Sequence, residues 1–291
     1  MRESKDRQTI LNLVDSAELR DLNARFSFIS YCTKLWQRRS FINADARSRA
    51  LSSGRETFLG NVWILLNPLL QVLLYVLVFG IILKTNRGIE NFVGFLVIGV
   101  TFFGFITQGL TSGSGLLQSS KAMITSFNFP KAAVPLSRSL RNCYDTIVPA
   151  LVAIVIALAF EPSFKVSWTL LLTIPIFALM AIFSTGLMLI AARMTTFIPD
   201  TKSLFNLVNR GLFFLSGIFF SVERFNGHVF VQNVMTFNPV YRYLSAMREV
   251  VMSQTLPTLD SWVYITLWAL ATFIFGLIYF WGGEERYVNH L

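Results

Sequence analysis

The chain has 291 residues, of which 54% are hydrophobic and only 14% are charged, and its mean hydropathy is +0.56. Its apolar residues form long blocks that no soluble core of this size needs, which excludes a soluble globular protein and predicts a multi-pass membrane protein. The net charge of +9 requires no nucleic acid as a partner, because the anionic headgroups of a lipid bilayer attract basic segments.

Six stretches of the chain are apolar and long enough to cross a bilayer, for which a helix needs roughly 20 residues. Residues 69–83 are apolar on every side, which indicates helices and not the alternating strands of a membrane barrel. The sequence therefore predicts an all-α integral membrane fold with six transmembrane helices. Their predicted ranges are 62–83, 91–117, 143–160, 168–192, 204–221 and 261–281.

Basic residues are distributed unevenly between the two sides that six spans create. The first 61 residues contain Lys or Arg at 11 positions, and residues 118–142 contain four basic residues and no acid. The segments on the other side contain fewer, so the positive-inside rule predicts that both termini are cytoplasmic. The first 61 residues also lack the apolar core of a cleavable signal peptide, so we expect the spans themselves to direct insertion. We divide the chain into a cytoplasmic tail, 1–61, and a membrane domain, 62–291.

Residues 19–42 have the pattern of an amphipathic helix that is too polar to span. Apolar side chains recur at helical spacing, and most of the basic ones fall elsewhere around the helix. The segment is predicted to lie along the inner leaflet, with its aromatic side chains as anchors. Packing against another subunit is the alternative. The apolar positions are Leu19, Leu22, Phe26, Ile29 and Trp36.

The start of the first span contains Asn67 and Pro68, and two interpretations are open. If the helix begins near Val62, Pro68 removes one backbone hydrogen bond inside it and kinks it. If Asn67 instead caps a new helix, Pro68 occupies the first helical position, where proline is tolerated. In either case Gly60 and Trp63 predict a bend at the inner interface, where tryptophan is favoured.

The second span carries Gly94, Gly99, Gly104 and Gly109 at intervals of five residues. Successive glycines are then rotated by roughly 140° around the helix axis, so they form a spiral and not one face. General close packing in a bundle explains this pattern, and flexibility beside a moving pathway is the alternative.

The loop after the second span contains a short cationic piece between Pro130 and Pro135. We expect a brief helix there that presents Lys131 together with flanking apolar residues such as Phe129. A merely solvated loop would not need these aromatic side chains, so the piece is predicted to dock on a soluble partner.

The segment from about 222 to 258 is too apolar for a free loop and is broken by Gly227, Pro239 and Pro257. Irregular backbone at membrane depth must be buried in protein, so short re-entrant helices in the outer leaflet are expected. A small extracellular cap is the alternative.

The sequence lacks the usual signatures of enzymes. It contains no GxxxxGK(S/T) nucleotide motif, no HExxH and no GxSxG, and Cys32 and Cys143 have no metal-binding spacing. We therefore expect no catalytic residue, no metal site and no cofactor in this chain, and a role other than that of an enzyme.

One charge lies inside a predicted span, namely Arg210, roughly 9 Å from the inner end. Snorkelling of its side chain to the headgroups would explain it. Alternatively, Asn206, Arg210 and Phe214 line an internal passage, because they occupy one helix face and a guanidinium binds phosphate well. Aromatic surface on which sugar rings can stack is added by Phe213, Phe219 and Phe220. Trp63 and Tyr75 complete the candidate substrate pathway.

Several short motifs occur in a characteristic order. They are Arg55 followed by Leu59, Gly60, Trp63, Leu66 and Pro68; "FNFPKAAVPLSRSL" (127–140); "FIPDT" (197–201); "FNPVYRYLSAMREVV" (237–251); and the aromatic residues from Tyr279 to Tyr287. Together they resemble the membrane subunit of type-II (ABC-2) ABC exporters, most closely the permeases for O-antigen, teichoic acid and capsular polysaccharide. The resemblance extends over nearly the whole chain from about residue 20.

This resemblance implies a homodimer in the bacterial inner membrane, paired with two copies of a separate ATPase that binds ATP and Mg²⁺. It implies export of a lipid-linked glycan through a bilayer-embedded passage. An interface helix is implied at 20–42, a coupling helix at 121–138 and re-entrant gate helices at about 226–250. The implied contacts to the ATPase are Phe129, Pro130, Lys131, Pro135 and Asp200, and the implied gate residues are Phe237, Asn238, Pro239 and Arg248.

The sequence departs from the family in one place and leaves other transporters open. The family often has an arginine–aspartate pair after the fourth span, whereas Pro199 precedes Asp200 here. An ABC exporter of drugs or lipids is an alternative. An ion-coupled secondary carrier is less favoured, because the predicted spans have no acid in their interiors. A membrane-embedded glycan-processing enzyme is a third hypothesis.

Overall fold

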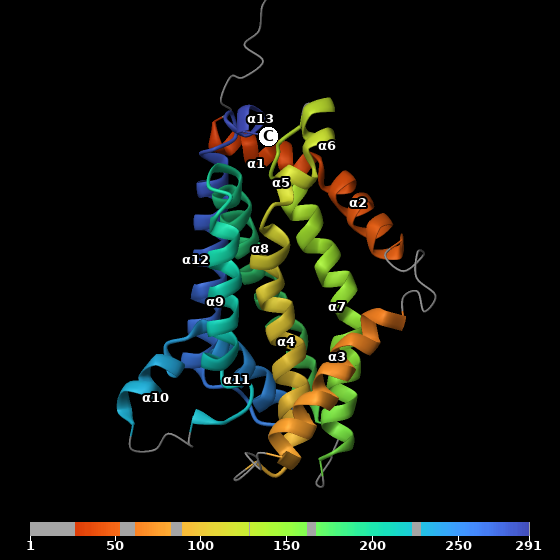
Figure 1. Cartoon of the computed structure of the whole chain (residues 1–291), viewed down its shortest axis with the longest axis vertical. Helices are drawn as coiled ribbons and strands as arrows, with labels where there is room; N and C mark the ends of the chain where they lie inside the picture. The colour runs from red at the N-terminus through yellow and green to blue at the C-terminus, as the bar shows by residue number, and fades with distance from the viewer. Residues whose placement is uncertain are drawn as a thin grey trace, which may run out of the picture.

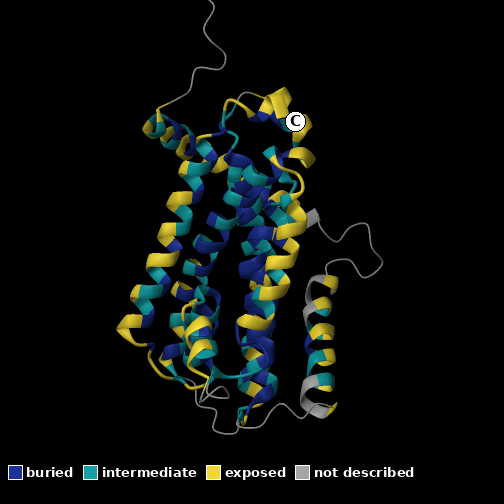
Figure 2. Cartoon of the chain, turned by 60° about the vertical axis from the view of Figure 1, so that its left-hand side comes forward, coloured by how far each residue is buried: buried dark blue, intermediate teal, exposed yellow. Residues whose placement is uncertain are grey.

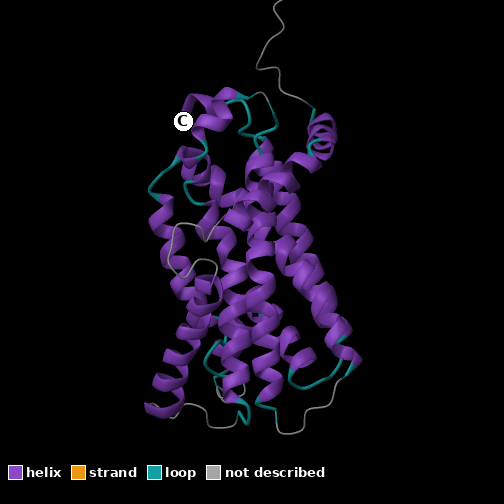
Figure 3. Cartoon of the chain, turned by 90° about the vertical axis from the view of Figure 1, so that its right-hand side faces the viewer, coloured by secondary structure: helices purple, strands orange, loops and turns teal. Residues whose placement is uncertain are grey.

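The computed structural model describes residues 27–52, 62–82, 89–127, 129–161, 167–222 and 228–290. Within these ranges every regular element is a helix, and the helices form one elongated bundle (Figures 1 and 3). The predicted all-α fold is confirmed. Most of the predicted N-terminal tail lies outside the described residues, as do Arg55, Gly60 and Gly227.

Four helices in the described ranges are long and apolar enough to cross a membrane. The helix α4 is the most buried of them, and α7 and α8 pack against it, while α12 packs on α8. Such burial explains why apolar residues occur on most sides of α4. The four helices are α4 (Phe92–Gly113), α7 (Ala133–Ala159), α8 (Thr173–Phe197), which follows the 3₁₀ turn η2 (Trp168–Leu172), and α12 (Leu259–Trp281).

The first predicted span is a continuous helix that changes type. The helix α3 (Val62–Tyr75) passes through Asn67 and Pro68 and continues as the π-helix η1 (Val76–Ile82). The interpretation in which the helix begins near Val62 is therefore correct, and a new helix at Pro68 is wrong.

Two other predicted spans have wrong boundaries. The third span begins ten residues before its predicted start, because α7 already begins at Ala133. The fifth is shorter than predicted, since α9 (Thr201–Leu215) has only 15 residues and ends before a turn. Gly217 in this turn has a φ of +61°, and an added Cβ would lie 3.0 Å from the Tyr241 ring. A glycine is needed there, and its left-handed backbone ends the helix.

The short helices gather at the two ends of the bundle (Figure 1). One end holds segments that we predicted to be cytoplasmic, and the other holds α10 (Val229–Thr236) and α11 (Pro239–Val251). The predicted single helix at 19–42 is wrong, because the chain breaks at Arg38 into two helices. The first end contains α1 (Phe28–Gln37), α2 (Arg39–Ser52), α5 (Leu116–Ser119), α6 (Lys121–Ser126) and α13 (Tyr287–His290).

The glycine spiral of α4 lets different helices approach it closely. A Cβ on Gly94 would lie 3.0 Å from the Cα of Ala157 in α7, and a Cβ on Gly99 would lie 2.5 Å from Arg248 in α11. A Cβ on Gly109 would clash with the backbone of Ser184 in α8, whereas a Cβ on Gly104 would have no atom within 4 Å. Three of the four glycines therefore serve close packing.

Many residues on the outer surface of the bundle are exposed (Figure 2), and a large number of them are apolar. Large apolar side chains are exposed along α7 and α12, where a soluble protein would place polar ones. These faces suit contact with lipid chains. Examples are Val148, Leu151 and Val155 on α7 and Leu267, Ile274 and Ile278 on α12.

Replacing Gly186 by alanine should destabilise the crossing of α8 and α12. A Cβ on Gly186 would lie 2.5 Å from the backbone of Thr272, so the helices must separate at a cost of roughly 1–3 kcal/mol. The same change at Gly104, which has open space, should be neutral or slightly stabilising, because alanine favours helices. Thermal unfolding of both variants in detergent measures the difference, and equal midpoints would contradict the close crossing.

Candidate functional site

The exposed face of α9 carries three residues of the candidate substrate pathway. Asn206, Arg210 and Phe214 are all exposed and lie on the same face, because they are four residues apart. In the described part of the chain no carboxylate pairs with Arg210. The face therefore offers a guanidinium, an amide and an aromatic ring to whatever lies beside the protomer. Their role in transport stays a prediction.

Phe213 lies on a different side of α9, where it joins an aromatic cluster. Its ring centre is 5.7 Å from that of Tyr75 in α3 and 5.2 Å from that of Phe103 in α4. Phe219 packs on the same rings, and Phe214 lies 5.6 Å from Phe213 at the edge of the cluster. The structure thus brings Tyr75, Phe213 and Phe214 together. The cluster ties α9 to α3 and α4.

Trp63 lies apart from these aromatic rings and lines a polar cleft of about 350 Å³ between α3, α4 and α7. A guanidinium and a carboxylate face each other in the cleft, with Arg141 Nε 3.4 Å from Asp145 Oδ2. The two residues are four positions apart on α7, a spacing that favours such an ion pair. Further polar side chains complete the lining, namely Asn67, Gln71, Thr101, Gln108 and Thr146.

The sequence interpretation missed this cleft, although a signal was present. Each of the three helices carries polar residues at helical spacing, such as Asn67 and Gln71, or Thr101 and Gln108. Each pair alone is a weak pattern within an apolar helix. Only the packing of α3, α4 and α7 shows that the pairs face one another.

At the end of the bundle that holds α1, the side chain of Glu284 connects three segments. Its carboxylate accepts a hydrogen bond from the Tyr31 hydroxyl at 2.7 Å and one from the backbone N–H of Lys131 at 2.7 Å. The Lys131 ammonium donates to the Glu284 carbonyl at 2.6 Å, and the Tyr31 hydroxyl accepts from Ala132 N at 3.1 Å. We call these four residues the Glu284 junction.

The junction corrects the prediction for the cationic loop. Lys131 does not project from a short helix between two prolines, because it lies in a turn and is bonded to Glu284. Pro130 is buried, and Pro135 belongs to the first turn of α7, where the missing N–H is tolerated. The short helix of this loop is α6, which begins ten residues before Lys131.

Burial sets the proton affinities in the Glu284 junction, which lies beyond the end of α12. It raises the pKa of Glu284 above its ordinary value, although the hydrogen bonds from Lys131 and Tyr31 act in the opposite direction. It also raises the pKa of Tyr31 well above its usual range, and the nearby Glu284 charge adds to this. Tyr31 therefore remains a proton donor at neutral pH.

An exposed aromatic hollow lies beside the junction. Its volume is about 310 Å³, and Phe41 and Phe129 line it with ring centres 6.1 Å apart. Phe127 is 67% exposed, so an apolar surface is open at this end of the bundle. Asp200, at the start of α9, is exposed as well. The remaining lining residues of the hollow are Arg38, Met123 and Phe127.

At the opposite end the predicted gate residues hold α11 in place. The Asn238 side chain accepts from the Val240 N–H at 3.0 Å and donates to the Ser216 hydroxyl at 3.0 Å, so it caps α11 and joins it to the end of α9. Pro239 follows in the first turn of α11. Phe237 is 71% exposed, and its carbonyl accepts from Tyr264.

The fourth gate residue, Arg248, is buried in the protein. Its guanidinium donates to the carbonyls of Gly217 at 2.9 Å and Phe95 at 3.1 Å, and its central carbon lies 3.4 Å from the Phe95 ring centre. These contacts join α11 to α4 and to the turn after α9. Gly99 leaves the space that the guanidinium occupies.

The described residues include no group of three His, Cys, Asp or Glu side chains that could hold a metal ion.

The sequence profile of the ABC-2 type transporter family matches residues 45–252. The chain is 20% identical over 224 residues to the O-antigen export system permease protein RfbA of Myxococcus xanthus, covering 77% of this chain and 85% of that protein. It is 24% identical over 221 residues to the protein of the same name from Klebsiella pneumoniae, covering 74% of this chain and 79% of that protein. Since the profile covers more than half of its residues, the chain belongs to the ABC-2 type transporter family.

Proposed function

We propose that this chain is the permease subunit of an ATP-driven ABC exporter that carries a lipid-linked cell-envelope polysaccharide or teichoic acid across the bacterial inner membrane. Two copies of the chain form the passage, and two copies of a separate ATPase supply the energy. Membership of the ABC-2 family and the two relatives named as O-antigen export permeases support this proposal.

The observation that carries the proposed cargo is the exposed face of α9. Arg210 is a charged residue on an otherwise largely apolar bundle, and a second copy of the chain beside this face would enclose it in a passage. A guanidinium there binds the phosphate groups of a lipid-linked glycan by charge-assisted hydrogen bonds. Phe214 on the same face offers a ring on which a sugar can stack.

The remaining architecture fits an exporter of this kind. In this proposal α3 with η1, and α9 with the turn that follows it, complete a set of six spans. The helices α1 and α2 lie along the cytoplasmic surface, and α10 with α11 re-enters the outer leaflet. The hollow between Phe41 and Phe129 receives the ATPase, so the end of the bundle that holds α1 and α13 faces the cytoplasm in this proposal.

A movement of the ATPase would reach the bundle through the Glu284 junction. The junction bonds the turn before α7 to α1 and to the segment after α12. Because these segments are held together, a displacement of the aromatic hollow moves α7 and α12 with it. At the outer end, Arg248 and Asn238 keep α11 attached to α4 and α9 while the passage is closed.

Arg210→Ala should reduce polymer export roughly tenfold or more, because a charge-assisted hydrogen bond contributes about 1.5–3 kcal/mol. Lys202→Ala, which removes a charge from the exposed first turn of the same helix, should leave export near normal. Surface glycan is measured in cells that carry each variant, at matched abundance of the complex. Normal export by Arg210→Ala would refute the role of this face.

The energy source and the cargo class need a separate experiment. The full complex, purified with any bound partner and placed in vesicles, should move lipid-linked glycan only when ATP is supplied. Movement driven by an imposed ion gradient without ATP would identify a secondary carrier, and ATP-driven movement of drugs or lipids but not of the glycan would identify the other exporter class. Conversion of the glycan in detergent by the chain alone would identify an enzyme.

A further inference from the structure

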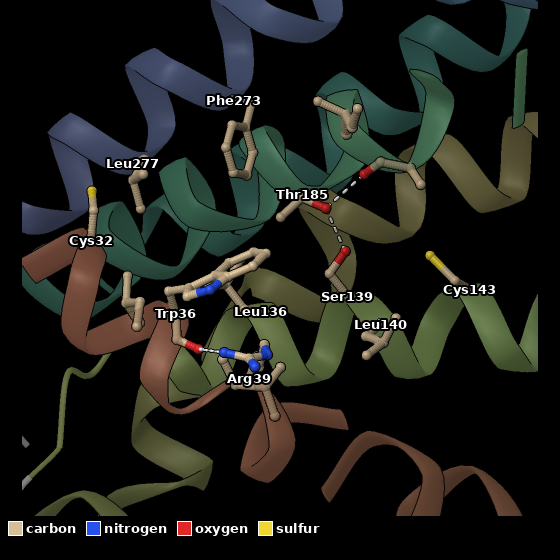
Figure 4. Close-up of a pocket in the computed structure, with 14 residues that line it drawn as sticks. Cys32, Trp36, Arg39, Leu136, Ser139, Leu140, Cys143, Thr185, Phe273 and Leu277 are labelled. Carbon is tan, nitrogen blue, oxygen red and sulfur yellow. Dashed lines mark hydrogen bonds between the residues drawn. The ribbon is translucent and has the colours of Figure 1, made fainter. Parts of the chain in front are cut away.

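An open groove beside α1 lies outside the candidate transport pathway. It has a volume of about 560 Å³ and lies between α1, the start of α2, α7, α8 and α12 (Figure 4). We call it the α1 groove. Its size falls within the range of roughly 300–1,000 Å³ that is usual for binding sites of small molecules.

The inner walls of the α1 groove are apolar. Leu136 and Leu140 of α7, Ala181 of α8 and Leu277 of α12 contribute to them. The hydroxyls of Ser139 and Thr185 lie 2.6 Å apart and bond each other, and Thr185 also donates to the Ala181 carbonyl at 2.6 Å (Figure 4). Since these polar groups already have partners, the walls favour an aliphatic chain over a polar ligand.

The rim of the groove on the α1 side is cationic and aromatic. Arg39 holds its guanidinium 5.2 Å from the Trp36 ring centre and donates to the Trp36 carbonyl at 3.4 Å. Among the described residues no carboxylate pairs with Arg39. Its remaining donors are therefore open to an anion, and a guanidinium binds a phosphate well. Trp36 is 69% exposed, as expected for a tryptophan at a membrane interface.

The position of the groove indicates where such a ligand comes from. The helices α7 and α12 that border it present exposed apolar faces along their length, which suit lipid chains. The amphipathic α1 crosses at the end of these faces (Figure 1). Segment 27–52 contains five basic residues and one acid, so this end also attracts anionic headgroups.

We propose that the α1 groove is a binding site for an anionic phospholipid. One acyl chain lies between α7, α8 and α12, and the phosphate group bonds the Arg39 guanidinium beside Trp36. The lipid fills the space between α1 and the bundle and so fixes α1 at the membrane surface. The proposal requires only that the chain lies in a membrane and does not depend on the identity of the exported cargo.

The test uses the full chain in vesicles that contain either phosphatidylglycerol or phosphatidylethanolamine with a photoreactive acyl chain. We expect crosslinks to peptides containing Leu140 and Leu277. Phosphatidylglycerol should be crosslinked about fivefold more than phosphatidylethanolamine, because one basic residue at a membrane surface attracts an anionic lipid by about 1 kcal/mol. Arg39→Gln should abolish this preference. Arg38→Gln is the matched control, because it removes the same charge from a neighbouring exposed residue that does not line the groove.

A second pair of variants tests the apolar part of the site. Ala181→Phe and Leu277→Trp each fill the groove and should lower the crosslinking of both lipids, and either variant suffices if the other does not fold. Equal labelling by both lipids in the native chain would show only annular lipid and overturn the proposal. If Arg38→Gln and Arg39→Gln reduced the preference for phosphatidylglycerol equally, the proposal would also be overturned. Displacement of phosphatidylglycerol by polyprenyl phosphate would assign the groove to the cargo instead.

Discussion

Glu284→Ala is expected to lower the free energy of unfolding by about 3 kcal/mol, because buried donors that lose their acceptor cost about 1–3 kcal/mol each. The substitution removes the acceptor of the Tyr31 hydroxyl and of the Lys131 N–H. Tyr31 is fully buried in the native chain, so its hydroxyl depends on partners within the protein. Thermal unfolding of the purified chain measures the loss, with Glu285→Ala, an exposed neighbour, as the control.

Glu284→Gln distinguishes the hydrogen bonds of the junction from its charge. The amide oxygen of a glutamine still accepts from the Lys131 N–H, whereas its amide nitrogen cannot accept from the Tyr31 hydroxyl and only donates to the Tyr31 oxygen. About half of the stability lost in Glu284→Ala should therefore be retained, because one of the two donors keeps its acceptor. A midpoint as low as that of Glu284→Ala would contradict the hydrogen-bonding role and indicate that the ionised carboxylate itself is essential.

The pH dependence of stability follows from the raised pKa of Glu284. Because its pKa in the folded chain lies above the ordinary value of 4.5, the folded state binds this proton more tightly than the unfolded state does. The contribution of the group is fully present below pH 4.5 and is lost as pH rises through the raised pKa. Thermal unfolding midpoints of the native chain and of Glu284→Gln are compared between pH 4.5 and neutral pH. The native chain should lose more stability than the variant as pH increases. Parallel curves would contradict the assignment.

Arg248→Ala is the second substitution with a large expected effect. It leaves the buried carbonyl of Gly217 without this donor, at about 1–3 kcal/mol, and removes a second donor from the half-buried Phe95 carbonyl of α4. It also empties the space beside Gly99. We expect α11 to separate from α4, so that the variant leaks small ions across vesicles and unfolds at a lower temperature. Both properties are measured on the reconstituted chain.

Two variants make this experiment specific. Arg242→Ala removes a guanidinium from the same helix, but that group is only partly buried and lies 3.8 Å from the exposed Asp260. Its loss should change stability by less than about 1 kcal/mol. Arg248→Lys should rescue the native behaviour only in part, because one ammonium replaces the planar fork that reaches both carbonyls. Full rescue by lysine would show that charge alone holds α11.

Most of the helical architecture could be predicted from the sequence. A membrane helix satisfies its backbone within one continuous apolar stretch, so composition along the chain is enough to locate it. The last span was predicted at 261–281 and extends from Leu259 to Trp281. The second was predicted at 91–117 and extends from Phe92 to Gly113. The family motifs were visible for the same reason, since each is a short continuous segment.

The candidate sites were only partly visible in the sequence. The shared face of Asn206, Arg210 and Phe214 followed from helical spacing, and the structure places all three on the exposed side of α9. The separation of Trp63 from Tyr75 and the polar cleft around Trp63 did not follow, because they depend on how α3 packs against α4 and α7. Periodicity describes one helix at a time.

The sequence by itself determined that this protein is a helical membrane protein, because the apolar stretches that cross a bilayer are local. The tertiary structure alone decided which polar groups meet. Lys131 bonds to Glu284, and Arg248 bonds to Phe95, in both cases across 153 residues of chain. A buried polar group must find a donor or acceptor wherever the packing places one, and separation along the chain does not determine that position.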